Sequence, residues 1–200
     1  ISVNAATIDV QVSASSDDAY HAPAGWPGYS HTATIVYAGK ISAGPVWGGW
    51  RWTGLGIPAG ATIQDAYVQL NQKAFGYQTP TTLALQDAAR PATFSSSSTP
   101  YNRWAARTAF QVDWTWPKSA PGSWIRTPGL VQGVQELVNN YGAIDEIVLL
   151  EDGTPATASQ YHEWESYESM PALAAKLHIA YATNTVSDST PPSTAILCNT

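Results

Sequence analysis

The densest cluster of reactive side chains in the sequence is residues 161–168, YHEWESYE. Glu163 and Glu165 stand two residues apart, so on a β-strand both carboxylates would point to the same face. Glycoside hydrolysis uses a pair of carboxylates, but these face each other across a cleft. Neighbouring carboxylates on one strand repel each other and stay solvated. The spacing therefore favours an edge strand protected by charge over a catalytic pair.

Asp17 and Asp18 form a second candidate site, because adjacent carboxylates in an irregular segment could ligate Ca²⁺. The simpler interpretation is a plain turn, since Asp favours turn positions. His21 and His31 flank the following segment without the convergent spacing of a histidine metal site. Ca²⁺ bound by the two aspartates is thus the one possible cofactor that the sequence suggests.

Familiar catalytic motifs are missing from the sequence. It contains no metalloprotease helix motif, no nucleophile elbow and no phosphate-binding loop. Ser, His and Asp residues occur, but their spacing singles out no triad, and triads are recognised by geometry. We therefore expect a protein that is not an enzyme.

Aromatic side chains are the compositional outlier, with nine Trp and ten Tyr against three Phe. Trp and Tyr combine an apolar face with a polar group, which suits sugar faces and wet interfaces. Those in Gly-, Pro- and Ser-rich connections are the best ligand-binding candidates, because binding sites are commonly built on loops of a rigid scaffold. The alternative role for each is to pin a loop onto the scaffold. These candidates are Trp26, Tyr29, Tyr77, Tyr101, Trp104, Trp116 and Trp124.

The charge balance argues against several partners. Nine Lys and Arg residues face fifteen Asp and Glu residues, a formal net charge of −6. Nucleic acid and strongly acidic polysaccharides need a concentrated cationic surface, so neither is an expected partner. No apolar run of eighteen residues exists, which argues against membrane insertion. Cys198 is the single cysteine, so the chain has no internal disulfide to stabilise it.

Alternating hydrophobicity predicts strands throughout the chain. We expect them at residues 7–13, 31–38, 46–53, 66–71 after a turn at 57–63 that enters this strand, 81–86, 107–114, 144–150 and 173–181, and loops at 21–30, 87–106 and 116–126. One helix is expected at about residues 128–141, with Thr127 as N-cap, Pro128 in the first position and Gly142 after its end. The pattern predicts an all-β, antiparallel jelly-roll-like β-sandwich with one short α-helix.

The chain is expected to divide into a module at residues 1–183 and a Ser/Thr/Pro-rich linker or tail at 184–200. We expect the tail to lead to a further segment. A first residue other than Met suggests that the chain is a processed or excised piece.

Residues 51–70, RWTGLGIPAGATIQDAYVQL, resemble the "R-F…IP-x-GATI-x-x-A-x-L-x-L" core of DNRLRE-type jelly-roll modules, which have relatives in bacteriophage structural proteins. Asp17-Asp18-Ala19-Tyr20 is similar to the early Asp-rich turn of that family, and segments within residues 107–137 and 165–181 resemble its later half. The resemblance spans about residues 5–183. It implies a jelly-roll fold in a non-catalytic module of an extracellular, cell-surface or virion protein.

Two functions fit these observations. The first is a binding module for neutral carbohydrate, in which loop aromatics stack on sugar rings beside Asn, Gln and Asp. The alternative is a structural component of a virion or surface assembly, such as a capsid decoration, tail or fibre protein. In that case the same aromatics form contacts between protein subunits, and a homo-oligomer is expected.

Overall fold

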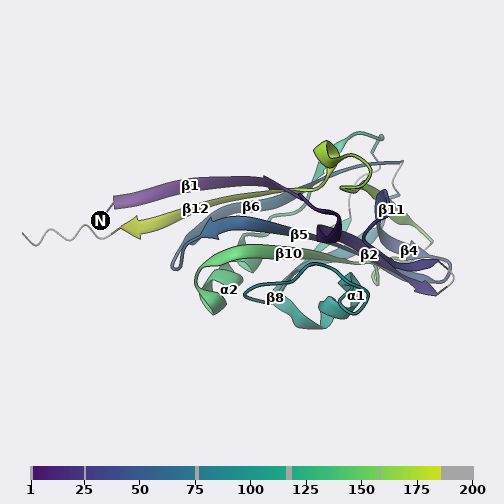
Figure 1. Cartoon of the computed structure of the whole chain (residues 1–200), viewed down its shortest axis with the longest axis horizontal. Coiled ribbons are helices and arrows are strands. Elements are labelled where there is room, and N and C mark those ends of the chain that lie inside the picture. Colours follow the sequence, from purple (N-terminus) through teal and green to yellow (C-terminus); the bar gives the residue numbers. More distant parts are fainter. Residues whose placement is uncertain (1, 25, 75–76, 116–118, 158, 186–200) are drawn as a thin grey trace, which may run out of the picture.

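A computed structural model describes residues 2–24, 26–74, 77–115, 119–157 and 159–185 of the chain. Over these ranges the chain forms two antiparallel sheets packed face to face (Figure 1). Consecutive strands cross repeatedly from one sheet to the other. The expected all-β, antiparallel sandwich is therefore confirmed.

The smaller sheet has four strands in the order β1-β12-β6-β9. On β6 the alternation places Ala66, Val68 and Leu70 in the core while Tyr67 and Gln69 face outward. The first and last long strands pair over their whole length, from Ser2 opposite Thr185 to Gln11 opposite Lys176. The strands are β1 (Ser2–Gln11), β12 (Lys176–Thr185), β6 (Thr62–Asn71) and β9 (Trp124–Arg126).

The larger sheet runs in the order β11-β4-β5-β10-β7-β8, and β2 joins it by pairing with both β5 and β3. Its edge strand β11 carries Glu163 and Glu165, which agrees with the expected charged edge. The strands are β2 (Asp18–Ala24), β3 (Pro27–Ser30), β4 (Ile35–Ile41), β5 (Gly44–Ile57), β7 (Pro80–Gln86), β8 (Arg107–Thr115), β10 (Ile144–Asp152) and β11 (Tyr161–Glu165).

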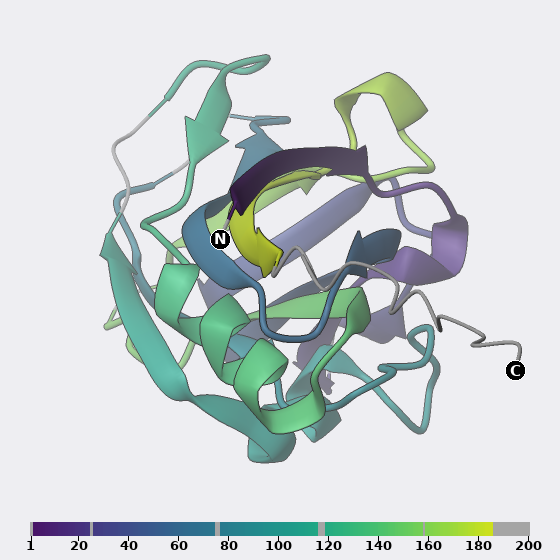
Figure 2. The same cartoon turned by 90° about the vertical axis from the view of Figure 1, so that its left-hand side faces the viewer.

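Helices are few and short in the described ranges. α2 (Val131–Tyr141) buries Val134, Leu137 and Val138 and packs against β6 of one sheet and β8 of the other (Figure 2). None of the described helices is long and apolar enough to cross a membrane. The remaining helical segments are η1 (Ser15–Asp17), α1 (Pro100–Arg103), η2 (Trp104–Ala106) and η3 (Pro171–Leu173).

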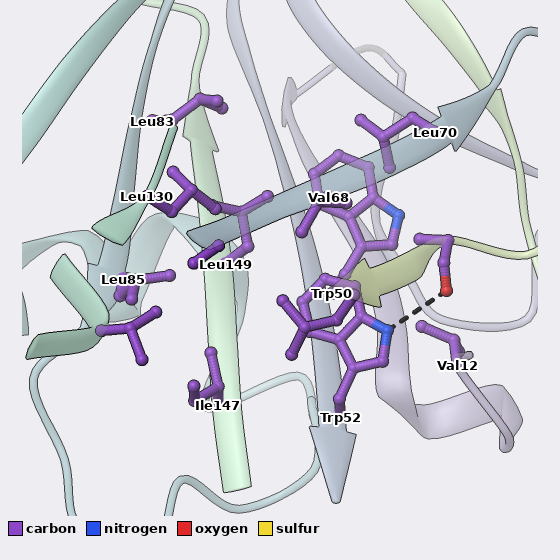
Figure 3. Packing of buried hydrophobic residues seen from close by; sticks show 14 of the residues in the cluster. Val12, Trp50, Trp52, Val68, Leu70, Leu83, Leu85, Leu130, Ile147 and Leu149 are labelled. Atoms are coloured by element: carbon purple, nitrogen blue, oxygen red, sulfur yellow. Dashed lines mark hydrogen bonds between the residues drawn. The ribbon is translucent and has the colours of Figure 1, made fainter. Parts of the chain in front are cut away.

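Large buried side chains from both sheets fill the space between them. Trp50 and Trp52 of β5 lie side by side in this core, close to Val12 and Val68 (Figure 3). The Nε1–H of Trp52 donates to the carbonyl oxygen of Ala175 at 3.2 Å, so the indole loses no hydrogen bond on burial. Complete burial of two Trp side chains shows that many aromatics of this chain serve the core.

Several predicted boundaries are wrong, among them the loop at 116–126, which contains β9, and the strand at 31–38, which lies at Ile35–Ile41. The helix starts at Val131, not at 128, because Thr127 exchanges hydrogen bonds with Val68 and so extends the β9–β6 pairing. Residues 21–30 are not a loop but contain the end of β2 and all of β3. β12 runs to Thr185, two residues past the expected module boundary, and the rest of the predicted tail lies outside the described residues.

Candidate functional site

The loop aromatics predicted as ligand contacts do not gather at one place. Trp26 and Tyr77 lie at the end of the molecule formed by β2, β4 and β11. Tyr101 packs on β2 and β5. Trp124 lies on the smaller sheet. Trp116 lies outside the described residues. Tyr29 and Trp124 are strand residues, and Tyr101 and Trp104 lie in short helical segments.

A shallow hollow of about 320 Å³ lined by aromatic side chains lies between β4 and the β2–β3 hairpin, and we call it the aromatic hollow. Its volume lies at the small end of the range found for ligand sites, about 300–1,000 Å³. β2 and β4 occupy the same end of the molecule (Figure 1, right). The lining residues are Tyr20, Trp26, Ala33, Thr34, Ile35 and Tyr37.

Strand alternation explains which side chains reach the aromatic hollow. On β4, Val36 and Ala38 are buried in the core, so Ile35 and Tyr37 point to the opposite face. The β2–β3 hairpin then packs over that face. Trp26, at the turn of the hairpin, closes the other side of the aromatic hollow.

The rings pack edge to face and hold one another in place. The centroids of Trp26 and Tyr37 lie 4.9 Å apart at 72°, and those of Tyr20 and Tyr37 lie 5.1 Å apart at 88°. Tyr161 of β11 contacts both Trp26 and Tyr37, at 5.5 and 5.6 Å. Edge-to-face pairs stabilise such a cluster. The rings are therefore preorganised, but they do not form a coplanar strip.

Polar groups lie at the margin of this cluster. Glu163 is the direct cross-strand partner of Tyr37, so the two side chains share a face. Burial raises the pKa of Glu163, and burial together with the charge of Glu163 raises the pKa of Tyr37 to about 12. The Tyr37 hydroxyl is therefore protonated at neutral pH and can donate a hydrogen bond. The neighbouring Glu165 is not a second free carboxylate, because Lys73 Nζ lies 2.9 Å from its Oε2.

A second surface lies on the outer face of the smaller sheet, where a hollow of about 250 Å³ opens beside Gln11, Gln69, Lys176 and His178. The aromatic rings here are already covered by cationic or imidazole groups. Lys176 Nζ lies 4.1 Å from the centre of the Trp124 ring, and Arg126 lies 3.5 Å from that of Tyr67. His178 also stacks on Tyr67. The cation-binding position over the Trp124 ring is thus already filled by Lys176.

Two other predicted contacts have packing partners. Tyr101 is half exposed, at 50%, and stacks on His21 at 5.2 Å and against Trp47 at 4.6 Å. The Trp104 ring lies under the guanidinium of Arg107, at 4.9 Å. Both residues connect the excursion between β7 and β8 to the larger sheet, which is the loop-pinning role that the sequence left open.

Asp17 and Asp18 have protein partners on different sides of the chain. Asp17 forms an ion pair with Arg51 at 2.8 Å. Asp18 accepts a hydrogen bond from the amide of Tyr167 at 2.8 Å. Within the described ranges, no three His, Cys, Asp or Glu side chains are grouped so that they could hold a metal ion. Calcium at this turn stays a prediction.

Sequence reasoning found Trp26 but missed Tyr20 and Tyr37, which complete the aromatic hollow. Both lie on strands, where a half-buried aromatic is normally a core residue. The one available signal was the position of Tyr37 in the strand alternation, which points its side chain away from the core.

Comparison with known proteins adds no relative. No protein-family model matches the chain, and no curated protein matches it.

Proposed function

We propose that this protein is a non-catalytic carbohydrate-binding module of an extracellular or virion-surface protein, and that the aromatic hollow holds the sugar. The observation that carries this proposal is the preorganised set of Tyr20, Trp26 and Tyr37 around a hollow of about 320 Å³. Sugar rings present apolar C–H faces that pack on aromatic rings, while their hydroxyls need hydrogen-bond partners.

The polar complement of the site supports the same function. Thr34, Tyr20 and Tyr37 all line the aromatic hollow and each carries a hydroxyl group, and burial raises the pKa of both tyrosines, so their hydroxyls are protonated at neutral pH. Hydroxyl groups both donate and accept, as sugar hydroxyls do. A mostly apolar hollow with a few polar groups is typical of small-molecule sites.

A glycan array followed by calorimetric titration of the best ligand tests the proposal. We expect Trp26→Ala to weaken binding by about 2 kcal/mol, roughly thirtyfold in Kd, because truncating an aromatic anchor removes most of its contact area. Trp124→Ala is the matched control and should leave Kd unchanged, since that ring already carries Lys176.

Assembly is the second candidate, and one observation favours it. β1 is an edge strand of ten residues that pairs with β12, and its sequence contains neither Lys nor Pro. Long edges without such residues can pair with another chain. Absence of glycan binding, together with a solution mass at a multiple of 21.4 kDa, would favour assembly over carbohydrate binding.

A further inference from the structure

We propose that the ligand of the aromatic hollow is an amino sugar with a free ammonium group, such as a glucosamine unit, recognised by the aromatic rings together with Glu163. This inference rests on the proposed carbohydrate-binding function and goes further by naming the class of sugar.

The first argument is the arrangement of rings. Tyr20, Trp26 and Tyr37 surround the aromatic hollow, and Tyr161 packs against two of them at 5.5 and 5.6 Å. Each ring has a negative electrostatic face, so several rings around one space attract a cation. Such aromatic cages are a known means of binding ammonium groups in proteins.

The second argument is that these rings have no cation of their own. Elsewhere in the described chain, Trp104, Tyr67 and Trp124 each carry an Arg or Lys at 4.9, 3.5 and 4.1 Å from the ring centre. The lining of the aromatic hollow contains neither Lys nor Arg. The place that a protein cation fills at the other rings is therefore open to a ligand cation.

The third argument is the position of Glu163. It stands opposite Tyr37 on the same face, and among the described residues its carboxylate has no ion-pair partner within 4.0 Å. The nearby cation Lys73 bonds Glu165 and Ser169 instead. Lys73 acts on Glu163 only at longer range, where its charge lowers the pKa against the effect of burial, so this half-buried carboxylate can still pair with an ammonium group brought by the ligand.

The charge of the whole chain fits the same class of ligand. A formal net charge of −6 repels acidic glycans and attracts cationic ones at low ionic strength. This attraction is general, so the test must separate it from recognition at Glu163.

The test is calorimetric titration with three tetrasaccharides of matched linkage, made of glucosamine, N-acetylglucosamine or glucose, at a pH where the glucosamine amino groups are protonated and Glu163 is ionised. We expect the glucosamine oligomer to bind about tenfold tighter than the other two. Glu163→Gln should remove that preference. Asp113→Asn is the matched control, because it deletes one exposed carboxylate on β8, at the opposite edge of the larger sheet, and should preserve the preference.

Equal or tighter binding of the glucose or N-acetylglucosamine oligomer overturns the inference and leaves the proposed function standing. Loss of the preference in Asp113→Asn as well would overturn it too, because general charge attraction would then explain it. Tetramethylammonium that binds as tightly as the glucosamine oligomer would show an ammonium site without sugar recognition. Absence of binding by every glycan contradicts the proposed function itself. Unchanged thermal unfolding of Glu163→Gln verifies that the variant is folded.

Discussion

Asp18 is a buried carboxyl that joins the start of β2 to the segment after β11. Its Oδ2 accepts the amide hydrogen of Tyr167 at 2.8 Å, 149 residues further along the chain. Burial raises the pKa of Asp18 to about 8, and the charges of Glu168 and Asp17 add to the rise. At neutral pH this side chain is therefore largely protonated, which lowers the cost of burying it.

This raised pKa predicts a loss of stability with rising pH. The unfolded state releases the Asp18 proton near pH 3.8 and the folded state near pH 8, so the folded state binds the extra proton between them. The contribution of this group to the free energy of unfolding is complete below pH 3.8. Between the two pKa values it falls by up to about 1.4 kcal/mol per pH unit, and it is lost once the pH has risen through about 8. In Asp18→Asn, the melting temperature should fall less between pH 5 and 9 than in the wild type. Parallel melting curves against pH would contradict this account.

Single residues of the aromatic hollow could be predicted from the sequence only in part. Trp26 was predicted because it is a large aromatic in a Gly- and Pro-rich segment. The shared face of Glu163 and Glu165 followed from their spacing, but both are half-buried, because Lys73 donates its amide hydrogen to the carbonyl oxygen of Glu163 and its ammonium group pairs with Glu165. Tyr20 could not be assigned, because alternation gives the face of a strand but not which other strand will cover that face.

At the scale of elements, the β4–β5 hairpin and the end of β10 approach each other with no room for a side chain. A Cβ on Gly153 would lie 1.8 Å from the carbonyl oxygen of Gly39 and 2.5 Å from that of Val46. Both neighbours are backbone atoms of paired strands, so they cannot move independently. This contact fixes β4, one wall of the aromatic hollow, against the larger sheet.

Gly153→Ala should therefore destabilise the protein by at least about 3 kcal/mol, since overpacking against backbone cannot be relieved by a rotamer change. Urea denaturation followed by tryptophan fluorescence measures the effect. Gly129→Ala is the control: a Cβ there meets no atom within 4 Å, and we expect a change within about 0.5 kcal/mol. Equal effects of the two substitutions would show that the close approach at Gly153 does not constrain the fold.

Strong hydrophobic periodicity predicted strands and the helix well, whereas the local sequence around a glycine did not reveal what the glycine does. The outward side chains of β6 and the buried face of α2 follow directly from their spacing. Adjacent glycines on a strand often mark a bulge, yet Gly48 and Gly49 pair in regular register with β10. A Cβ on Gly49 would lie 2.6 Å from the Phe94 ring. Gly49 thus serves close packing against a distant segment, which no local pattern can reveal.

For the whole molecule, alternating hydrophobicity predicted the fold class, and the distribution of aromatic side chains supports the proposed function. Exposed large side chains such as Tyr77, Tyr101 and Met170 lie on different segments and not in one broad patch. Scattered exposed aromatics are normal on a monomer surface. The aromatic hollow, at one end of the sandwich, is the feature that favours binding over assembly.

The most direct test of carbohydrate binding at the aromatic hollow is a nitrogen–proton NMR titration of the tryptophan indoles with the best glycan. Each indole gives its own resonance, which a Trp→Phe variant of that residue assigns. Binding at the aromatic hollow predicts that the Trp26 resonance moves progressively to saturation while those of Trp124 and Trp104 stay in place. An unmoved Trp26 resonance beside a shifting Trp124 resonance would contradict the account and place the ligand on the smaller sheet.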